Sequence, residues 1–275
     1  MTGRAFVAAC ALTVAIGGAT PTSAAPSPVT TKTVVVKIAG RSFPARLSYP
    51  TRGGPYPAVA FAHGYMNRSF WYAETLQSIA AAGYVVIAPD SETGRFPGHG
   101  RLANDLNRSL RWLGEKSTTG TTDVPRGKVN SARLAVAGHS MGGGVALLAA
   151  ARSRAVDTVV TLAAAETAPP ASVAVRRLRV PSLFVVGSDD RIVPAAGTAV
   201  MFRRAPSPAL LASITGGSHC GFMEVVPLGC DAGRVSYDRQ LRLTREQIRR
   251  WFARYLRARK TARVTGVPGV RYVND

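Results

Sequence analysis

The chain has 275 residues, 46% of them hydrophobic, and carries 35 basic against 15 acidic residues for a formal net charge of +20 at pH 7. This length suffices for one compact core and is short for two. The basic excess predicts attraction to anionic lipids, polymers or other acidic surfaces, although a solvated arginine-rich surface would have the same composition. No nucleic-acid-binding motif accompanies the charge, so we expect no nucleic-acid partner.

The first 25 residues have the pattern of a secretory signal peptide. Arg4 precedes an apolar run from Ala5 to Ile16, and the small residues Ala24 and Ala25 offer a cleavage site. An uncleaved membrane anchor is the alternative, but about a dozen apolar residues fall short of the roughly 20 that span a bilayer. We therefore expect residues 1–25 to be removed and the mature protein to be secreted.

Apolar strand-like segments alternate with helical ones along the rest of the chain. Two strands are predicted first, over Thr33–Ile38 and Ala45–Pro50. Further strands are predicted over Pro57–Ala62, Tyr84–Ala88, Arg133–Ala137, Val156–Leu162, Leu183–Val186 and Leu210–Ile214. Helices are predicted between them over Tyr72–Ala82, Arg101–Trp112 and Met141–Arg152. This alternation predicts the α/β class, with a mostly parallel sheet covered by helices on both faces.

The last predicted element is an amphipathic helix that begins near Leu243. Thr244 and Gln247 have the spacing of a capping box. Apolar residues then recur every three or four positions, at Ile248, Trp251, Phe252, Tyr255 and Leu256. We expect this stripe to pack on the sheet, whereas the arginine-rich opposite face would also suit a membrane surface. Residues 261–275 are expected to form a flexible tail.

The segment Gly138-His139-Ser140-Met141-Gly142 lies between a predicted strand and a predicted helix. It fits the pattern G-x-S-x-G of a nucleophile elbow, in which the chain turns sharply with the serine at the apex. Side chains two residues before and after that serine would collide, so glycine is needed at positions 138 and 142. Ser140 is therefore the predicted nucleophile.

A serine hydroxyl needs a neighbouring base, and the chain has 4 histidines. His139 lies inside the elbow, so its ring should point away from Ser140. His63 follows the first buried strand, and His99 lies in a Pro/Gly loop. His219 follows the last predicted strand, at the sheet edge where open parallel sheets place their sites. His219 is the predicted base, with a loop histidine beside a disulfide as the alternative interpretation.

The acid is expected between the serine and the histidine in the chain. The segment Gly187-Ser188-Asp189-Asp190-Arg191-Ile192-Val193-Pro194 follows a predicted strand there. This segment, the elbow and the G-x-S-H segment ending at His219 resemble the three catalytic segments of the α/β-hydrolase superfamily, in its order. The resemblance covers most of residues 33–258 and implies an α/β-hydrolase fold. Matched residue by residue, it places the acid on Asp190 rather than Asp189. The spacings of 50 residues from Ser140 to Asp190 and 29 from Asp190 to His219 leave no room for a large lid.

Acyl transfer through a tetrahedral intermediate also needs backbone N–H donors for the oxyanion, and Met141, which follows the serine, would supply one. The segment His63-Gly64-Tyr65-Met66 resembles that of bacterial cutinases and polyester hydrolases, as does Gly-His-Ser-Met-Gly-Gly-Gly. This resemblance implies that the Tyr65 amide is the second donor. The block Ser69–Trp112 is similar also to chlorophyllase-type and dienelactone-hydrolase-like esterases.

Removal of the signal peptide would take away Cys10 and leave Cys220 and Cys230, an even pair that predicts one disulfide in an oxidising compartment. Because the remaining histidine, cysteine and acidic residues form no ligand cluster, we expect no metal or organic cofactor.

These observations predict a single catalytic domain over residues 26–260 that acts as a secreted serine esterase on small or polymeric esters, as a monomer. Acyl transfer or peptide hydrolysis by the same residues is an alternative within enzymes. A cell-wall or polyanion-binding module on a hydrolase scaffold without activity is the alternative outside them.

Overall fold

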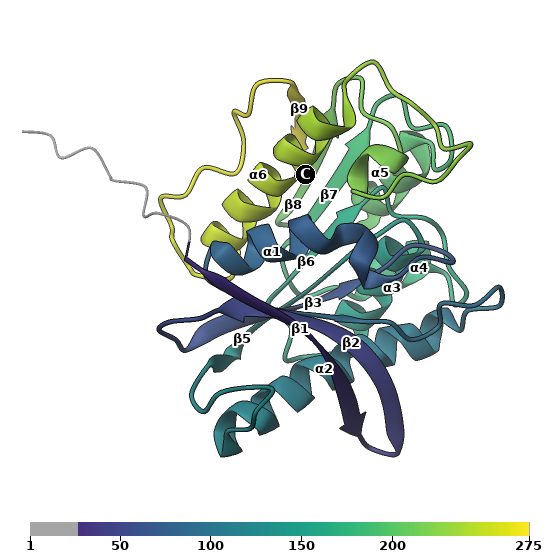
Figure 1. Cartoon of the computed structure of the whole chain (residues 1–275). Coiled ribbons are helices and arrows are strands. Elements are labelled where there is room, and N and C mark those ends of the chain that lie inside the picture. Colours follow the sequence, from purple (N-terminus) through teal and green to yellow (C-terminus); the bar gives the residue numbers. More distant parts are fainter. Residues whose placement is uncertain (1–26, 275) are drawn as a thin grey trace, which may run out of the picture.

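The computed structural model describes residues 27–274, so the predicted signal peptide lies outside the described part of the chain. The described residues form one sheet in the order β1-β2-β4-β3-β5-β6-β7-β8-β9 (Figure 1). Its strands are β1 (Val29–Ile38), β2 (Arg41–Pro50), β3 (Tyr56–Ala62), β4 (Val85–Pro89), β5 (Val129–His139), β6 (Thr158–Leu162), β7 (Ser182–Gly187), β8 (Ala209–Ile214) and β9 (Val270–Asn274). Strands β4, β3, β5, β6, β7 and β8 run parallel to one another, while β1, β2 and β9 pair antiparallel at the edges. The predicted α/β class is confirmed.

Helices cover both faces of the sheet. They are η1 (Ser69–Tyr72), α1 (Ala73–Ala81), α2 (His99–Thr119), α3 (Met141–Arg152), α4 (Ala171–Ala174), η2 (Val175–Arg177), α5 (Ala195–Arg204), η3 (Cys220–Phe222) and α6 (Tyr237–Tyr255). Helices α1 and α6 contribute to one buried cluster and α2, α3 and α5 to the other. Successive side chains of a strand point to opposite faces of the sheet, so each strand can contribute to both clusters. In β3, Ala58 and Ala60 lie in one cluster and Val59 and Phe61 in the other.

The parallel strands bring several loops to one edge of the sheet. The loops after β3, β5, β7 and β8 all leave the carboxyl ends of strands that neighbour one another or lie one strand apart. These loops begin at His63, Ser140, Ser188 and Thr215. Chain segments far apart in the sequence therefore meet there, as expected for an open parallel sheet.

Helix α2 is longer than the sequence predicts. It continues past Trp112 to Thr119 and ends at Gly120, whose φ of +75° suits a residue without a side chain. Ser117 is buried in this extension, and its hydroxyl accepts a hydrogen bond from the Val129 N–H at 2.9 Å. Because the last turn of α2 is polar in composition, the sequence pattern does not predict this contact with β5.

The predicted start of the final helix is wrong. Helix α6 begins at Tyr237, with Ser236 as its N-cap accepting from the Arg239 N–H. Thr244 lies inside the helix and donates to the Gln240 carbonyl at 2.8 Å, so its capping-box spacing is coincidental. The predicted apolar stripe does pack on the sheet, with Ile248, Trp251, Phe252 and Leu256 buried.

The prediction of a flexible tail is wrong for residues 270–274, which form β9 antiparallel to β8. Val270 and Tyr272 alternate toward the α6 side and are half-buried there. The Tyr272 hydroxyl accepts hydrogen bonds from Gln247 Nε2 at 2.7 Å and from the Val267 N–H at 3.2 Å. These contacts fix the strand at the edge of the sheet.

Candidate active site

Ser140 lies at the sharp turn between β5 and α3. Its φ of +57° and ψ of −123° are costly for a residue with a side chain and are held by surrounding hydrogen bonds. Its N–H donates to the Leu162 carbonyl at 2.8 Å, and its carbonyl accepts from Gly143 and Ala165, both at 2.9 Å. Hydrogen bonds to the end of β6, to the residues after it and to the first turn of α3 therefore hold this turn.

The two elbow glycines occupy positions where no side chain fits. A Cβ added to Gly138 would overlap the backbone of Gly142, and one added to Gly142 would overlap the Ala62 carbonyl at the end of β3. Both approaches are between backbone atoms, which cannot move aside. The requirement for glycine that the pattern predicts therefore has a direct steric cause.

His219 and Asp190 form a buried pair. The Nδ1 atom of His219 lies 2.8 Å from Oδ2 of Asp190, and the two side chains are only 6% and 1% exposed. The other oxygen, Oδ1, accepts the N–H groups of Ile192 at 3.0 Å and Val193 at 2.7 Å. The carboxylate is therefore held with one oxygen facing the imidazole.

Asp189 has a different partner, although it is adjacent in the chain. Its carboxylate accepts from Arg234 Nε at 2.8 Å and from the Ser188 hydroxyl at 3.0 Å. Hydrogen bonds from the Arg234 guanidinium hold the pKa of Asp189 well below its usual range. Of these two carboxylates, Asp190 is thus the one that bonds the His219 ring.

The Tyr72 hydroxyl links two loops to the elbow. It accepts hydrogen bonds from the Gly64 N–H at 3.1 Å and from Asn67 Nδ2 at 3.2 Å. Its own proton is then available to His139 Nδ1, 2.9 Å away, which assigns a neutral ring to His139 with its proton on Nε2. Burial lowers the pKa of His139 well below its ordinary value, and the neighbouring His219 lowers it further.

His219 also lies against the elbow itself. Its ring centroid is 4.6 Å from that of His139, the residue immediately before Ser140. The structure thereby brings the predicted base against the predicted acid and against the residue that precedes the predicted nucleophile.

The other two histidines hold loops. The ring nitrogens of His63 face the carbonyls of Gly64 at 2.8 Å and Ser91 at 2.9 Å. Nδ1 of His99 accepts the Ala168 N–H at 2.9 Å. Neither ring takes part in the His219 and Asp190 pair.

The two predicted oxyanion donors belong to segments that border Ser140. Met141 is the first residue of α3, where helix N–H groups have no acceptor within the helix. A Cβ on Gly64 would lie 3.5 Å from the Ser140 Cβ, so the loop that carries Tyr65 lies against the elbow. The Tyr65 side chain is half-exposed, and its hydroxyl donates to the Arg95 carbonyl at 3.0 Å.

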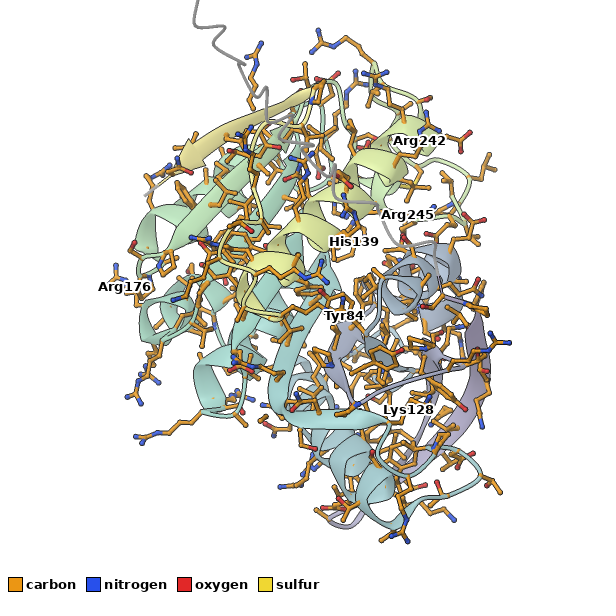
Figure 2. All side chains as sticks on the ribbon, turned by 90° about the vertical axis from the view of Figure 1, so that its left-hand side faces the viewer. Tyr84, Lys128, His139, Arg176, Arg242 and Arg245 are labelled. Atoms are coloured by element: carbon orange, nitrogen blue, oxygen red, sulfur yellow. A yellow bond between two sulfur atoms is a disulfide. The ribbon has the colours of Figure 1, made fainter. Side chains whose placement is uncertain are left out.

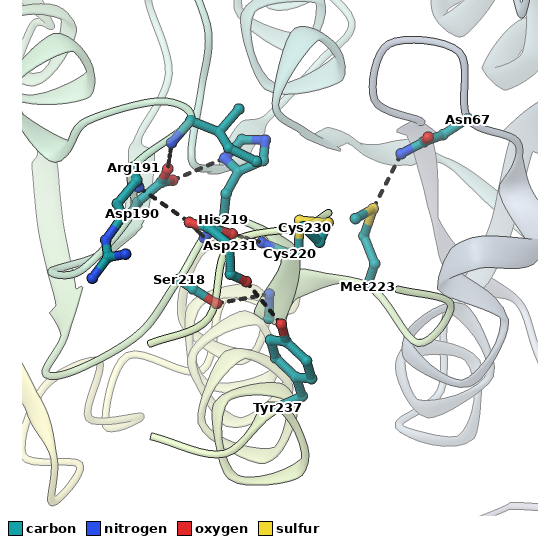
Figure 3. Close-up of a disulfide and its surroundings, with 12 residues drawn as sticks. Asn67, Asp190, Arg191, Ser218, His219, Cys220, Met223, Cys230, Asp231 and Tyr237 are labelled. Atoms are coloured by element: carbon teal, nitrogen blue, oxygen red, sulfur yellow. Dashed lines mark hydrogen bonds and ion pairs between the residues drawn. A yellow bond between two sulfur atoms is a disulfide. The ribbon is translucent and has the colours of Figure 1, made fainter. Parts of the chain in front are cut away.

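Asp231 joins the loop after β7, which carries Asp190 and is here called the acid loop, to the loop after β8, which carries His219 (Figure 3). The sequence does not reveal this role. Its Oδ2 accepts the N–H groups of Arg191 at 3.1 Å and His219 at 2.9 Å. Its Oδ1 accepts the Cys220 N–H at 2.9 Å, and its backbone carbonyl accepts the Tyr237 hydroxyl at 2.8 Å. Because the Asp231 carboxylate bonds only backbone N–H groups, no sequence motif marks this role. The one signal in the sequence is its position directly after Cys230.

The predicted disulfide is present between Cys220 and Cys230. Cys220 directly follows His219, and Cys230 directly precedes Asp231. The bridge, drawn in Figure 3, closes the loop from Cys220 to Cys230, and Asp231 follows directly after that loop. It therefore helps to fix the carboxylate that holds the His219 backbone.

Large exposed apolar side chains gather on the loops around this site. They extend from η1 and from the loops after β3, β4, β7 and η3, and comprise Tyr65, Met66, Phe70, Phe96, Ile192, Val225 and Leu228. A hollow of about 590 Å³ adjoins the acid loop and is lined partly by Ile192, Val193 and Pro194 and by Val200 and Met201 of α5. The surroundings of the site thus suit an apolar ligand.

Within residues 27–274, no three histidine, cysteine or acidic side chains gather in a way that could hold a metal ion. The helices of that same range include none with the length and hydropathy needed to cross a membrane.

The mostly parallel sheet, the strained serine at the strand-to-helix turn and the histidine and aspartate on later loops define an α/β-hydrolase. Residues 16–224 match the family model described as "PETase: PET hydrolase-like". The chain belongs to this PET hydrolase-like family.

Three curated relatives share its sequence in part. Chlorophyllase-1 of Arabidopsis thaliana is 32% identical over 124 residues, which is 44% of this chain and 37% of that protein. Cutinase est1 of Thermobifida alba is 31% identical over 148 residues, 54% of this chain and 47% of the cutinase. Cutinase est2 of the same organism is 30% identical over 174 residues, 62% of this chain and 55% of the cutinase. The chain thus spans about half the length of these relatives or less.

Proposed function

We propose that this protein is a secreted serine hydrolase of carboxylic esters, with Ser140, His219 and Asp190 as its catalytic triad. The observation that carries the proposal is the buried 2.8 Å contact between His219 and Asp190, with the same imidazole packed on the residue before Ser140. Membership of the PET hydrolase-like family and similarity to proteins named cutinase and chlorophyllase support ester hydrolysis. The signal-like residues 1–25 and the disulfide support export.

In the proposed reaction, Ser140 Oγ attacks the ester carbonyl while His219 Nε2 takes its proton. Asp190 bonds Nδ1, so it orients the ring and stabilises the imidazolium that forms. The backbone N–H groups of Met141 and Tyr65 stabilise the negative oxygen of the tetrahedral intermediate. His219 then returns the proton to the departing alcohol, and a water molecule activated in the same way releases the acid and frees Ser140.

The substrate we propose is an ester with an apolar body, either small or polymeric. The exposed apolar side chains on the surrounding loops, among them Tyr65, Phe96 and Ile192, would contact that body directly. The hollow beside Val193 offers room for part of it. No cofactor is needed for this chemistry.

Nitrophenyl esters of increasing chain length and a polyester film, each assayed with the mature protein, test the proposal. Ser140→Ala should reduce turnover on the order of 10⁴- to 10⁶-fold while the fold is kept, because triad removal has this effect in other serine hydrolases. Ser153→Ala, at the far end of α3, is the matched control and should retain activity. A serine-reactive phosphonate should label Ser140 alone.

Other outcomes separate the alternatives. Labelling of Ser140 together with transfer to an added alcohol in preference to water would make the protein an acyltransferase, and cleavage of a peptide but no ester would make it a peptidase. If neither labelling nor turnover is found in folded protein, the enzyme assignment fails.

A further inference from the structure

A cleft of about 650 Å³ lies at the amino ends of strands β6 and β7, whereas the candidate active site lies at the carboxyl ends of the strands. One wall is the end of α3 with the loop toward β6, and the other is η2 with the loop toward β7. Both loops lead into the amino ends of their strands. Ser140, Asp190 and His219 all lie beyond carboxyl ends, so the cleft and the site face away from each other.

Positive charge dominates this cleft. Five of its lining residues are arginines and none is acidic, the arginines being Arg152, Arg154, Arg176, Arg177 and Arg179. All five are exposed, and Figure 2 shows Arg176 projecting from the surface. Within residues 27–274, none of them forms an ion pair. Arg152 alone makes side-chain hydrogen bonds there, to the Gly100 carbonyl at 2.9 Å and the Asn104 amide oxygen at 3.2 Å.

Of these five arginines, only Arg152 has side-chain contacts within the described residues that account for its place in the fold. The carbonyl end of α3 favours a nearby cation, which accounts for Arg152 in its last turn. That effect does not extend to the three arginines on the opposite wall, which come from another segment. Like charges that share a cleft repel one another, and a bound anion would relieve this repulsion.

We propose that this cleft binds a linear polyanion carrying repeated phosphate groups. Guanidinium groups bond phosphate oxygens in pairs, and arginines on both walls can hold successive phosphates of one chain. No aromatic side chain lines the cleft, so it lacks the stacking surface with which proteins hold single-stranded nucleic acid. A polymer without bases therefore fits better than a nucleic acid.

The shape also favours a polymer over a membrane. A chain can enter a recess between two walls, whereas a flat bilayer would meet only the rim. Two large exposed apolar side chains lie toward the amino ends of the strands among the described residues, and neither lines the cleft. Val173 lines a separate small hollow, and Val273 of β9 lies beside Leu211 of β8. The cleft thus has no large exposed apolar side chain of the kind that inserts into a bilayer and anchors a protein there. A polymer held in the cleft would leave the opposite edge, with Ser140, open to substrate.

Binding of inorganic polyphosphate to the mature protein at about 0.15 M salt tests this inference, since screening removes weak diffuse attraction at that ionic strength. The variant R154Q/R176Q/R177Q/R179Q should bind about tenfold more weakly or worse, with a shallower dependence on salt. The control K37Q/R52Q/R242Q/R271Q removes the same number of charges from exposed positions elsewhere. Arg242 lies far from Arg176 in Figure 2, so this control should keep most of the affinity.

Both variants change only exposed side chains and should keep the parent's thermal midpoint and its turnover of a soluble ester. Should one fail to fold, the pair R176Q/R179Q measures the same effect on one wall. Equal losses in cleft and control variants would mean diffuse charge and would overturn the site. Tighter binding to anionic phospholipid vesicles or to a single-stranded oligonucleotide than to polyphosphate would overturn the choice of partner.

Discussion

Asp190 and Asp189 are adjacent aspartates with different surroundings. Asp190 is buried against His219, whereas Asp189 pairs with the exposed Arg234. We expect Asp190→Asn to lower kcat about 10⁴-fold, because an amide in this position favours the wrong imidazole tautomer. Asp189→Asn should lower kcat far less, since its partner Arg234 lies outside the proposed triad. Steady-state kinetics on a soluble nitrophenyl ester measure both, and a larger loss from Asp189→Asn would contradict the assignment.

Asp231 offers a second test at a single residue. Asp231→Ala would leave the N–H groups of Arg191, His219 and Cys220 without their acceptor, so the acid and base loops would lose a shared anchor. Small displacements of catalytic groups are costly, and kcat should fall by up to about 100-fold with KM nearly unchanged.

Partial rescue distinguishes positioning by Asp231 from general destabilisation. Asp231→Asn keeps one acceptor oxygen and should recover part of the lost kcat. Asp123→Ala, in the loop before β5 at the other edge of the sheet, is the control and should have parental kinetics. Equal kcat in the Asp231 variants and the parent would show that the anchor is dispensable.

At the level of whole elements, α3 is the one that the sequence defines best. Its observed bounds, Met141–Arg152, equal the predicted ones, because the elbow glycines set its start and an Ala/Leu run sets its length. The parallel pairing of the central strands was likewise open to prediction from their near-continuous apolar runs, whereas their spatial order was not. The candidate triad follows from the same strands, since each member lies in the turn or loop that follows one of them.

Elements that depend on tertiary contacts were not open to prediction. Strand β9 is an edge strand of mixed composition, stabilised by β8 and by the bond between Tyr272 and Gln247. The N-cap at Ser236 gives a weaker sequence signal than the spacing of Thr244 and Gln247, yet it is the one the chain uses. Helix α5 starts with Ala-Ala-Gly and buries few side chains, so its pattern is faint.

The disulfide between Cys220 and Cys230 closes part of the loop between η3 and α6. For so short a loop, loop-entropy arguments give roughly 2 to 3 kcal/mol of stabilisation, which is modest beside its position between His219 and Asp231. We expect mild reduction to lower esterase turnover several-fold while far-UV circular dichroism at 25 °C stays unchanged.

The double variant Cys220→Ser/Cys230→Ser should reproduce the effect of reduction and no longer respond to reductant. Thiol titration of the unfolded mature protein checks the bond itself. Two reactive thiols without reductant would exclude the bridge in solution.

The molecule as a whole presents two unlike edges. Exposed apolar side chains border the site at the carboxyl ends of the strands. Arginines that have no ion pair within residues 27–274 line the cleft at the amino ends. The net charge of +20 is therefore less informative than its distribution. Exposed arginines such as Arg68, Arg95 and Arg191 lie near the site too, but there they alternate with exposed apolar side chains.

The segments that would have to form a lid are anchored elsewhere. Residues 166–179, between β6 and β7, carry α4 and η2 and bury Ala171, Val175 and Leu178 against α3 and its neighbours. Residues 116–130 lie at the amino edge, with Val124 buried. The loop from Met223 to Ser236 borders the site but is tied down at Glu224, which accepts from Thr75 and Arg245, and at the disulfide.

The site should therefore be open in solution, and turnover should not need an oil–water interface. Hydrolysis of a short-chain ester should rise hyperbolically with concentration up to the solubility limit, without a jump where droplets or micelles form, because no cover has to be displaced first. Initial rates measured across that limit, with and without a detergent at its critical concentration, provide the test. A sharp activation at the limit would require a mobile cover over Ser140 and would place the protein among lipases instead.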